Sequence, residues 1–292
     1  MFVFMVLRQY DNIPGKAPRL WSGNAMTANL QRHFGGAIPD FYERGMAPVM
    51  FAPAAAVTAT RVAAHAPERV LETAAGTGQV TRLLAMRLPA GTAITATDLA
   101  PAMLALAAET LSDAPAVELQ PADAQALPFA DAAFDLVLTQ FGVMFFPDRA
   151  GAMREAARVL RPGGRFVFTT WDSRETNPYA AVAADLVVEA TGEPGVFGLA
   201  YGLTSLDAVR TLVEEAGFTG FRAEVVRLDA PVPDVGLFAA GLLRGNPTAA
   251  LLHERGVEPE PLVAELERRL RDTLGDPATA RLQMLLFEAV KP

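Results

Sequence analysis

The chain has 292 residues, of which 51% are hydrophobic, with a formal net charge of -8 and no cysteine. This length allows one large domain or two small ones. The acidic balance and the scattered basic residues argue against a nucleic-acid footprint, and the lack of cysteine excludes disulfides, thiolate nucleophiles and cysteine-ligated zinc.

The first residues have little periodicity. Residues 1–25 carry proline, glycine and asparagine without a repeat, which predicts an extended tail, and Met26 opens a more regular segment and is a candidate for the true start. Residues 26–67 are predicted to be an N-terminal helical segment, with a helix over 48–66. No signal peptide and no stretch long enough to span a bilayer is expected, so we predict a soluble cytoplasmic protein.

From residue 68 onward, apolar runs alternate with amphipathic segments. Strands are predicted at 69–73, 93–98, 116–123, 134–141 and 164–171, and helices at 80–88, 101–111 and 148–160, the last with Asp148 as its N-cap. Strands separated by helices of this length predict a parallel sheet, because parallel neighbours need a long crossover. The turn "RPGG" at 161–164 leads into the fifth strand.

The last third of the chain adds a helix at 206–217 and strands at 221–228 and 281–290. The predicted fold class is α/β, a doubly wound, mostly parallel sheet with an antiparallel closing strand. Residues 68–231 and 276–292 form the predicted core, and residues 232–275 form a mainly helical insertion, either a cap or a dimer contact. The chain is expected to be a monomer or a homodimer.

The first strand and the turn after it, "VLETAAGTGQV" at 70–80, indicate a nucleoside-type ligand. In open α/β sheets, ligands bind at the carboxyl ends of the strands, and glycines let a ligand approach the backbone. A pyrophosphate site would prefer G-x-G-x-x-G, but Thr81 takes the last place here. The carboxylate of Glu72 suits a cationic or amine-bearing ligand better than a phosphate.

Two further acids end the next strands. Asp98 lies 20 residues beyond Gly78 and could accept hydrogen bonds from both hydroxyls of a ribose. It could equally cap the helix at 101–111, and the two roles are compatible. Asp123, followed by Ala124, could bind the exocyclic amine of an adenine, and its alternative is a surface turn acid.

Four segments together resemble a known family. They are "VLETAAGTGQVT", "TDLAPAML", "ADAQALPFADAAFDLVLTQFG" and "REAARVLRPGGRFVFTTW", which occur in order over residues 68–172. They are similar to the class I S-adenosylmethionine-dependent methyltransferases, in particular the group with the ubiquinone/menaquinone C-methyltransferases. The resemblance implies a Rossmann-like fold, S-adenosyl-L-methionine as cofactor and a small-molecule methyl acceptor.

The resemblance also implies a set of cofactor contacts. Glu72, Gly76, Thr77 and Gly78 would surround the methionine moiety, and Asp98 would hold the ribose with Leu99 and Met103 nearby. The adenine would meet Asp123 and Ala124, and Gln140 would lie beside the sulfonium and the acceptor. Tyr42 resembles an aromatic residue that closes over the cofactor. Two positions depart from the usual pattern: Glu72 replaces an aspartate, and Ala74 replaces the first glycine, as it does in the quinone methyltransferases.

Catalysis by positioning requires no nucleophilic side chain, and a general base is needed only when the acceptor must lose a proton. His33 is the candidate base, although a surface or capping role is its alternative, and Gln140 is a candidate positioning residue. No H-E-x-x-H motif or carboxylate cluster is present in the sequence, so no catalytic metal is expected.

Aromatic residues are expected to form the acceptor pocket, namely Phe141, Phe145, Trp171, Phe197 and Tyr201, each with an ordinary core position as its alternative. The last two lie in the glycine-rich segment 195–202, which is predicted to be a mobile loop that closes the site. From these apolar residues we expect the methyl acceptor to be an aromatic or otherwise lipophilic small molecule. Two other functions stay open: an NAD-dependent oxidoreductase, and a non-catalytic S-adenosylmethionine-binding interaction protein.

Overall fold

A computed structural model describes residues 38–114 and 117–292, so the predicted tail, Met26 and His33 lie outside the described residues. Within them one sheet has the order β3-β2-β1-β4-β5-β7-β6. All neighbours from β3 to β5 pair in parallel, and β7 runs antiparallel to β5 and β6. The predicted fold class is confirmed. The strands are β1 Arg69–Thr73, β2 Ala93–Asp98, β3 Val117–Pro121, β4 Phe134–Gln140, β5 Leu160–Trp171, β6 Thr219–Pro231 and β7 Thr279–Val290.

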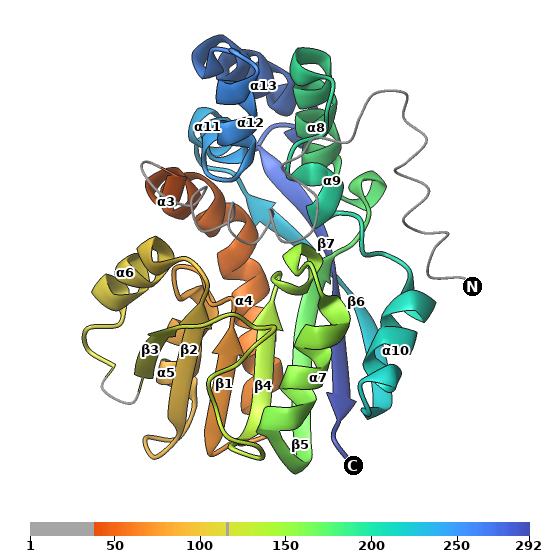
Figure 1. Ribbon diagram of the computed structural model, residues 1–292. Helices are drawn as coiled ribbons and strands as arrows, with labels where there is room; N and C mark the ends of the chain where they lie inside the picture. The colour runs from red at the N-terminus through yellow and green to blue at the C-terminus, as the bar shows by residue number, and fades with distance from the viewer. Residues whose placement is uncertain (1–37, 115–116) are drawn as a thin grey trace.

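Helices cover both faces of this sheet (Figure 1). Val70 packs in a cluster with α4 (Ala52–Ala63) and α5 (Gln79–Arg87). Its neighbour Leu71 packs in a second cluster with α7 (Arg149–Val159) and α10 (Leu206–Glu215). Successive strand residues point to opposite faces, so a strand between two helical layers is apolar throughout. A further helix, α6 (Pro101–Thr110), lies beside β2 and β3.

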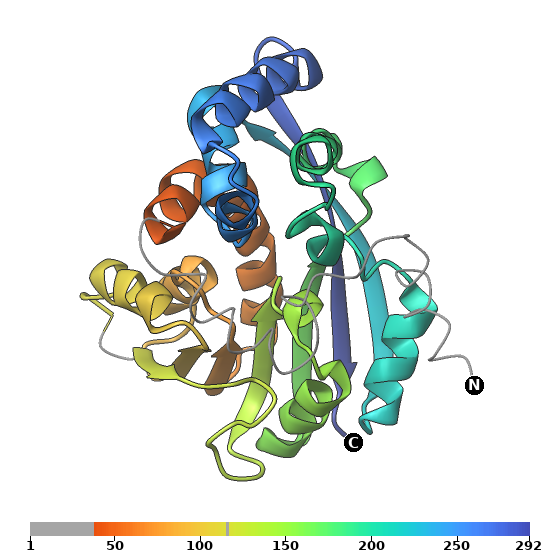
Figure 2. The ribbon, with the colours of Figure 1, turned by 45° about the horizontal axis from the view of Figure 1, so that its top comes forward.

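A third layer of helices lies beyond the carboxyl ends of the strands, where β6 and β7 extend up to meet it (Figures 1 and 2). Its buried residues form one cluster with the end of β5. This layer contains α3 Ile38–Phe41, the π-helix η2 Tyr42–Phe51, α8 Pro178–Thr191, α9 Phe197–Ala200, α11 Val235–Arg244, α12 Thr248–Glu254 and α13 Pro259–Leu274. Two 3-10 turns, η3 Val143–Phe145 and η4 Arg174–Thr176, complete the description.

Three predicted elements differ from the structure. The helix predicted from residue 48 already includes Ile38, the first described residue, because Pro48 lies inside a π-helical stretch and does not start a new helix. The "RPGG" turn is part of β5, where the pairing register shifts opposite Asp135. The segment 195–202, expected to be a glycine-rich loop, contains the short helix α9.

The N-terminal helix is longer than predicted, which bears on the expectation that no stretch is long enough to span a bilayer. By length and composition, Ile38–Ala63 is apolar enough to cross a membrane, and α11 with α12 passes the same test as a bent pair. However, 56% of the residues in the apolar window of Ile38–Ala63 are buried inside the protein. The helix packs against α5 and α11, which is how a core helix of a globular fold meets the same criterion.

The N-terminal helix and α11 cross at glycines. A Cβ atom on Gly45 would lie 2.6 Å from the carbonyl oxygen of Leu237 and 2.8 Å from the Cα of Gly241. One on Gly245 would lie 2.8 Å from the backbone nitrogen of Tyr42. The two backbones therefore touch directly, and the helix that carries Tyr42 is held against the helical segment 232–275.

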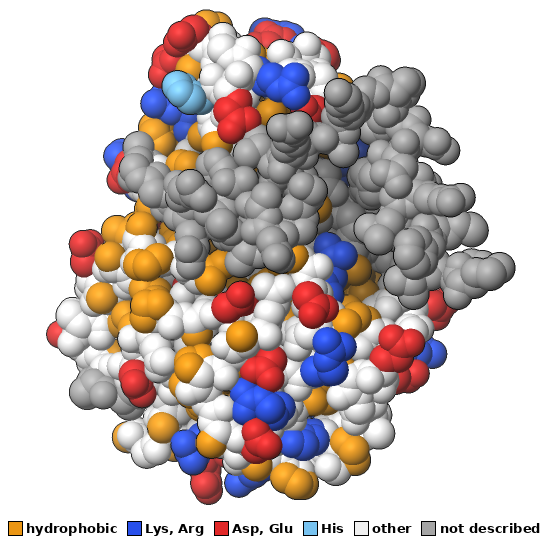
Figure 3. Space-filling model, in the orientation of Figure 1, with side chains coloured by type: hydrophobic (Ala, Val, Ile, Leu, Met, Phe, Trp, Pro, Cys, Tyr) orange, Lys and Arg blue, Asp and Glu red, His pale blue; other side chains and the backbone are white. Residues whose placement is uncertain are grey.

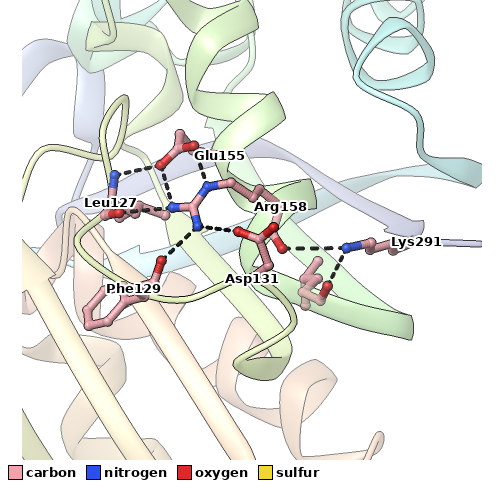
Figure 4. A network of polar contacts seen from close by, with 7 residues as sticks. Leu127, Phe129, Asp131, Glu155, Arg158 and Lys291 are labelled. Carbon is pink, nitrogen blue, oxygen red and sulfur yellow. Dashed lines mark hydrogen bonds and ion pairs between the residues drawn. The ribbon is translucent and has the colours of Figure 1, made fainter.

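An ion-pair network fixes the long loop between β3 and β4 (Figure 4). Arg158 on α7 donates to the carbonyl oxygens of Phe129 and Leu127 at 2.7 and 2.9 Å, and it pairs with Glu155 and Asp131. On the face seen in Figure 3, acidic and basic side chains accordingly lie intermingled over α7 and this loop. The loop begins at the end of β3, so the network steadies the segment that contains Asp123.

Candidate active site

A cavity of about 190 Å³ lies between the carboxyl ends of the strands and the third layer of helices. It sits beside the switch point between β1 and β4, where ligands of doubly wound sheets bind. One half is formed by polar strand ends and backbone, and the other half by aromatic and aliphatic side chains. Of the described residues that line it, the charged ones are Asp98 and Asp123, both acidic.

Asp98 joins the first two strand ends. Its Oδ2 accepts a hydrogen bond from the backbone N–H of Gly76 and its Oδ1 accepts one from that of Ala100, both at 2.8 Å. Withdrawal from water raises the pKa of Asp98, and these backbone hydrogen bonds oppose the rise. Ala100, not Asp98, is the N-cap residue of α6. Asp98 lines the cavity, and because a carboxylate oxygen can accept more than one hydrogen bond, this side chain suits the two donors of a ribose diol.

Glu72 lies behind the cavity surface rather than on it. It is 1% exposed, and its Oε2 accepts a hydrogen bond of 2.7 Å from the hydroxyl of Thr81. Burial raises the pKa of Glu72 to about 8, the hydrogen bond from Thr81 opposes this rise, and the charge of Asp98 adds to it. Thr81 stands where a dinucleotide site would need its last glycine, so this position holds a carboxyl group instead of admitting a phosphate.

The turn after β1 bends through left-handed backbone. Ala74 has φ of 52° and Gly76 has φ of 57°. A Cβ on Gly76 would lie 3.7 Å from Met103 Cε and 3.9 Å from Tyr42 Oη, so the backbone there is open to the cavity between these two side chains. Ala74, Leu99 and Met103 line the cavity, whereas Thr77 is buried and Gly78 packs against α6.

The residues that follow β3 form the remaining side of the polar half of the cavity. Asp123 and Ala124 line the cavity with Gln125, whose backbone N–H donates to Asp123 Oδ1 at 2.9 Å. Asp123 is thus part of a local turn and also faces the cavity. The turn role of this residue is confirmed, and its contact with an adenine stays a prediction.

Gln140 ends β4 and is held from behind by α4. The hydroxyl of Thr58 lies 2.7 Å from Gln140 Oε1 and 3.0 Å from the carbonyl oxygen of Ala54, and it shares its proton between them. Thr58 is fully buried, whereas Gln140 lines the cavity. Among the described residues, the amide nitrogen of Gln140 has no partner, so its N–H donors are available to a bound molecule.

This contact leads to a prediction about rate. Thr58→Val removes the hydroxyl without changing the side-chain shape, so Gln140 loses its anchor. We expect about a tenfold lower kcat, equivalent to about 1.4 kcal/mol, in the reaction that the sequence resemblance implies, with the affinity for the implied cofactor unchanged. Thr58→Ser is the matched control and should keep the rate. Equal rates in the valine and serine variants would show that the hydroxyl does not position Gln140.

Six aromatic rings form a row along the cavity wall. Tyr42 stacks on Phe51 with ring centroids 4.7 Å apart, and Phe51 is 5.9 Å from Phe141. Phe141 stacks on Trp171 at 3.9 Å with an interplanar angle of 8°. Tyr201 is 6.2 Å from Trp171 and 6.4 Å from Phe197. We call these residues the aromatic row; all six line the cavity.

The backbone conformation of Phe141 sets the direction of its ring in the aromatic row. Phe141 has φ of 54°, which non-glycine residues seldom adopt, and its N–H donates to the carbonyl oxygen of Thr169 at 3.1 Å. This conformation places the ring of Phe141 against Trp171. Gly142 follows directly, and a Cβ there would lie 2.6 Å from the Cβ of Ala74, so the β4 turn packs closely against the β1 turn.

The structure therefore brings most of the sequence-predicted site residues to one cavity. Phe145 lines it beside the aromatic row, while Glu72, Thr77 and Gly78 support it from behind. Phe197 and Tyr201 are 2% and 7% exposed and belong to a packed wall, and movement of their segment stays a prediction. Sequence reasoning missed Thr58 and several lining residues of the third layer, namely Met46, Met50, Phe51 and Asn246.

Within the described residues, no group of three or more His, Asp or Glu side chains is placed to hold a metal ion. His33, the candidate base, lies outside the described ranges. The site as described therefore offers hydrogen-bond donors, two carboxylates and apolar surface.

Comparison with known proteins agrees with this arrangement. The methyltransferase domain family matches residues 71–168. An uncharacterised protein of Mycobacterium tuberculosis is 35% identical over 189 residues, which cover 59% of this chain and 67% of that one. The demethylmenaquinone methyltransferase of Thermus thermophilus is 45% identical over 104 residues, 35% of this chain and 46% of that enzyme. This chain thus matches less than half of the quinone enzyme's length.

A solved structure shows the same fold over a larger range. The YcgJ protein of Bacillus subtilis covers 81% of this chain and 98% of its own, with a TM-score of 0.54 and 17% identity. The sequence matches and the geometry of the strand ends point to one family.

Proposed function

Because this chain belongs to the class I S-adenosylmethionine-dependent methyltransferases, we propose that it methylates a lipophilic aromatic small molecule. The observation that carries the proposal is the single cavity with two unlike halves. Its polar half is suited to a nucleoside, and its aromatic half is suited to a flat apolar acceptor.

The polar half fits S-adenosylmethionine better than a dinucleotide. The charged side chains that line the cavity are both carboxylates, which attract a sulfonium and an ammonium and repel a pyrophosphate. We propose that Asp98 holds the ribose, that Asp123 and Ala124 meet the adenine, and that Tyr42, Ala74, Gly76, Leu99 and Met103 enclose the rest. Family membership overturns the oxidoreductase alternative.

The cofactor supplies an activated methyl group on its sulfonium. The residues of this chain hold the acceptor in line with that group and exclude water, and such positioning contributes about 7–11 kcal/mol in well-oriented reactions. Gln140 lies at the junction of the two halves, where a donor can orient the acceptor. Leu242, Asn246 and Pro247 line the cavity, so we propose that residues 232–275 act as a cap, in a protein of the cytoplasm.

The role of Asp98 gives a second prediction. In Asp98→Ala the ribose loses its acceptors, and the N–H groups of Gly76 and Ala100 lose their partners. We expect the affinity for S-adenosylmethionine, measured by calorimetry, to fall at least tenfold, about 1.4 kcal/mol. Glu109→Ala, on the exposed side of α6, is the control and should bind as wild type. Unchanged affinity in Asp98→Ala would show that Asp98 serves only the turn.

A binding and turnover experiment tests the function as a whole. We expect S-adenosylmethionine and S-adenosylhomocysteine to bind and NAD not to bind. In a methyl-transfer screen with phenols, quinol precursors, amines and carboxylates, we expect the aromatic uncharged acceptors to be methylated and the carboxylates not. Turnover of carboxylates alone would contradict the acceptor class. Cofactor binding without turnover of any acceptor would favour the non-catalytic interaction protein.

A further inference from the structure

Two tyrosine hydroxyls that the proposed transfer does not use form a pair at the wall of the aromatic half of the cavity. The phenolic oxygens of Tyr179 and Tyr201 are 2.8 Å apart. Tyr179 is fully buried on α8 and does not line the cavity, whereas Tyr201, just after α9, does. A ligand can therefore reach this pair only at Tyr201.

The burial of Tyr179 decides which hydroxyl donates. Among the described residues, the hydroxyl of Tyr179 has Tyr201 as its one polar partner. A buried O–H that donates to nothing is costly, so Tyr179 donates its proton to the oxygen of Tyr201. The proton of Tyr201 is then not needed within the pair. It is left as a hydrogen-bond donor on the cavity side.

The surroundings keep this donor neutral. Burial raises the pKa of Tyr201, and the hydrogen bond from Tyr179 opposes the rise without cancelling it. The described residues of the aromatic half include no charged side chain, because Asp98 and Asp123 both lie at the strand ends of the other half. A charged group on the acceptor would find no counter-ion here. A neutral oxygen with a lone pair would be satisfied.

We propose that Tyr201 is a specificity-determining residue, whose hydroxyl donates a hydrogen bond to an uncharged oxygen on a flat aromatic acceptor. The rings of Trp171 and Phe197 lie on either side of Tyr201 in the aromatic row, at 6.2 and 6.4 Å. A planar molecule lying along this row presents an edge oxygen to Tyr201. This proposal rests on the proposed function and narrows its acceptor to ring systems that bear a carbonyl, ether or hydroxyl oxygen.

Two probes of nearly equal shape test the hydrogen bond. In 1-tetralone a carbonyl group replaces one methylene of tetralin, so the two differ by a single acceptor oxygen. Their affinities are measured by calorimetry on the full chain saturated with S-adenosylhomocysteine. The readout is the ratio of the two affinities in each variant relative to wild type, because this double ratio cancels the unequal partitioning of the probes from water.

Three variants separate hydrogen bonding from packing. Tyr201→Phe alone leaves the hydroxyl of Tyr179 buried without an acceptor, so the double variant Tyr179→Phe/Tyr201→Phe removes both partners and avoids that cost. We expect the preference for 1-tetralone to fall about tenfold in the double variant, with tetralin affinity unchanged. Tyr179→Phe keeps the donor on Tyr201 and should keep the preference.

The outcomes are distinct. An unchanged preference in the double variant, or equal losses for both probes, would overturn the role of Tyr201. If the protein binds S-adenosylhomocysteine but then binds neither probe, the proposal is also overturned. The proposed binding of the cofactor would still stand. Failure of S-adenosylhomocysteine itself to bind would contradict the proposed function instead.

Discussion

Glu72→Gln is expected to make the cofactor-free protein more stable than wild type at pH 8, and no more stable at pH 4.5. Burial raises the pKa of Glu72 from 4.5 to about 8, so the folded protein keeps a proton there that the unfolded chain releases. The stability from this proton is fully present below pH 4.5 and is lost as the pH rises toward 8. The free energy of unfolding falls by at most about 1.4 kcal/mol per pH unit, which amounts to a loss on the order of 4 kcal/mol over this range.

Urea unfolding at several pH values between 4.5 and 8 checks this expectation. Glutamine is neutral and can still accept the hydrogen bond from Thr81, so the variant should lose the slope and keep the packing. Glu109→Gln, on the exposed side of α6, is the control and should follow wild type. Burial also lowers the pKa of His65, and its contribution to the pH dependence is common to all three proteins. Equal slopes in wild type and Glu72→Gln would contradict a protonated Glu72.

Gly45→Ala is expected to lower the free energy of unfolding by about 3 kcal/mol, the upper range for overpacking a tight contact. The new Cβ would lie 2.6 Å from the carbonyl oxygen of Leu237 and 2.8 Å from the Cα of Gly241. Both are backbone atoms, which no side-chain rotation can move aside, so the helices must separate. Since Tyr42 lies one turn earlier on the same helix, affinity for S-adenosylmethionine should fall as well.

The matched control is Gly91→Ala, because a Cβ there would meet nothing within 4 Å. Thermal and urea unfolding should leave this variant within about 0.5 kcal/mol of wild type, as for most surface substitutions. If Gly45→Ala is as stable as the Gly91 variant, then the crossing of the two helices does not hold the third layer in place.

The sheet and the polar half of the site could be predicted because their signals are local. The central strands are mainly apolar runs of the right length, and the functional residue lies at the carboxyl end of a strand or just after it, as at Asp98 and Asp123. The edge where parallel strands end is common to all of them, so residues far apart in sequence meet there without knowledge of the packing.

The aromatic half could be predicted only in part, because it is assembled by tertiary contacts. Phe141 follows β4 and Trp171 ends β5, and both were expected at the pocket. Phe51 lies on the N-terminal helix, and its contacts with Tyr42 and Phe141 depend on how that helix packs. Thr58 gave no signal in sequence, since a threonine on an apolar helix face is ordinary until Gln140 is seen beside it. Gly45 and Gly241 are 196 residues apart, and nothing in either segment indicates the other.

The stacking of Trp171 on Phe141 also makes the site optically visible. The indole lies in the wall of the cavity, and its emission depends on the polarity of what touches it. The chain has 2 tryptophans, and the other, Trp21, lies outside the described residues. Trp21→Phe therefore yields a protein with one tryptophan, which can be excited selectively and is located where the acceptor is proposed to bind. Its spectrum reports occupancy of the cavity without a label, for any molecule that enters.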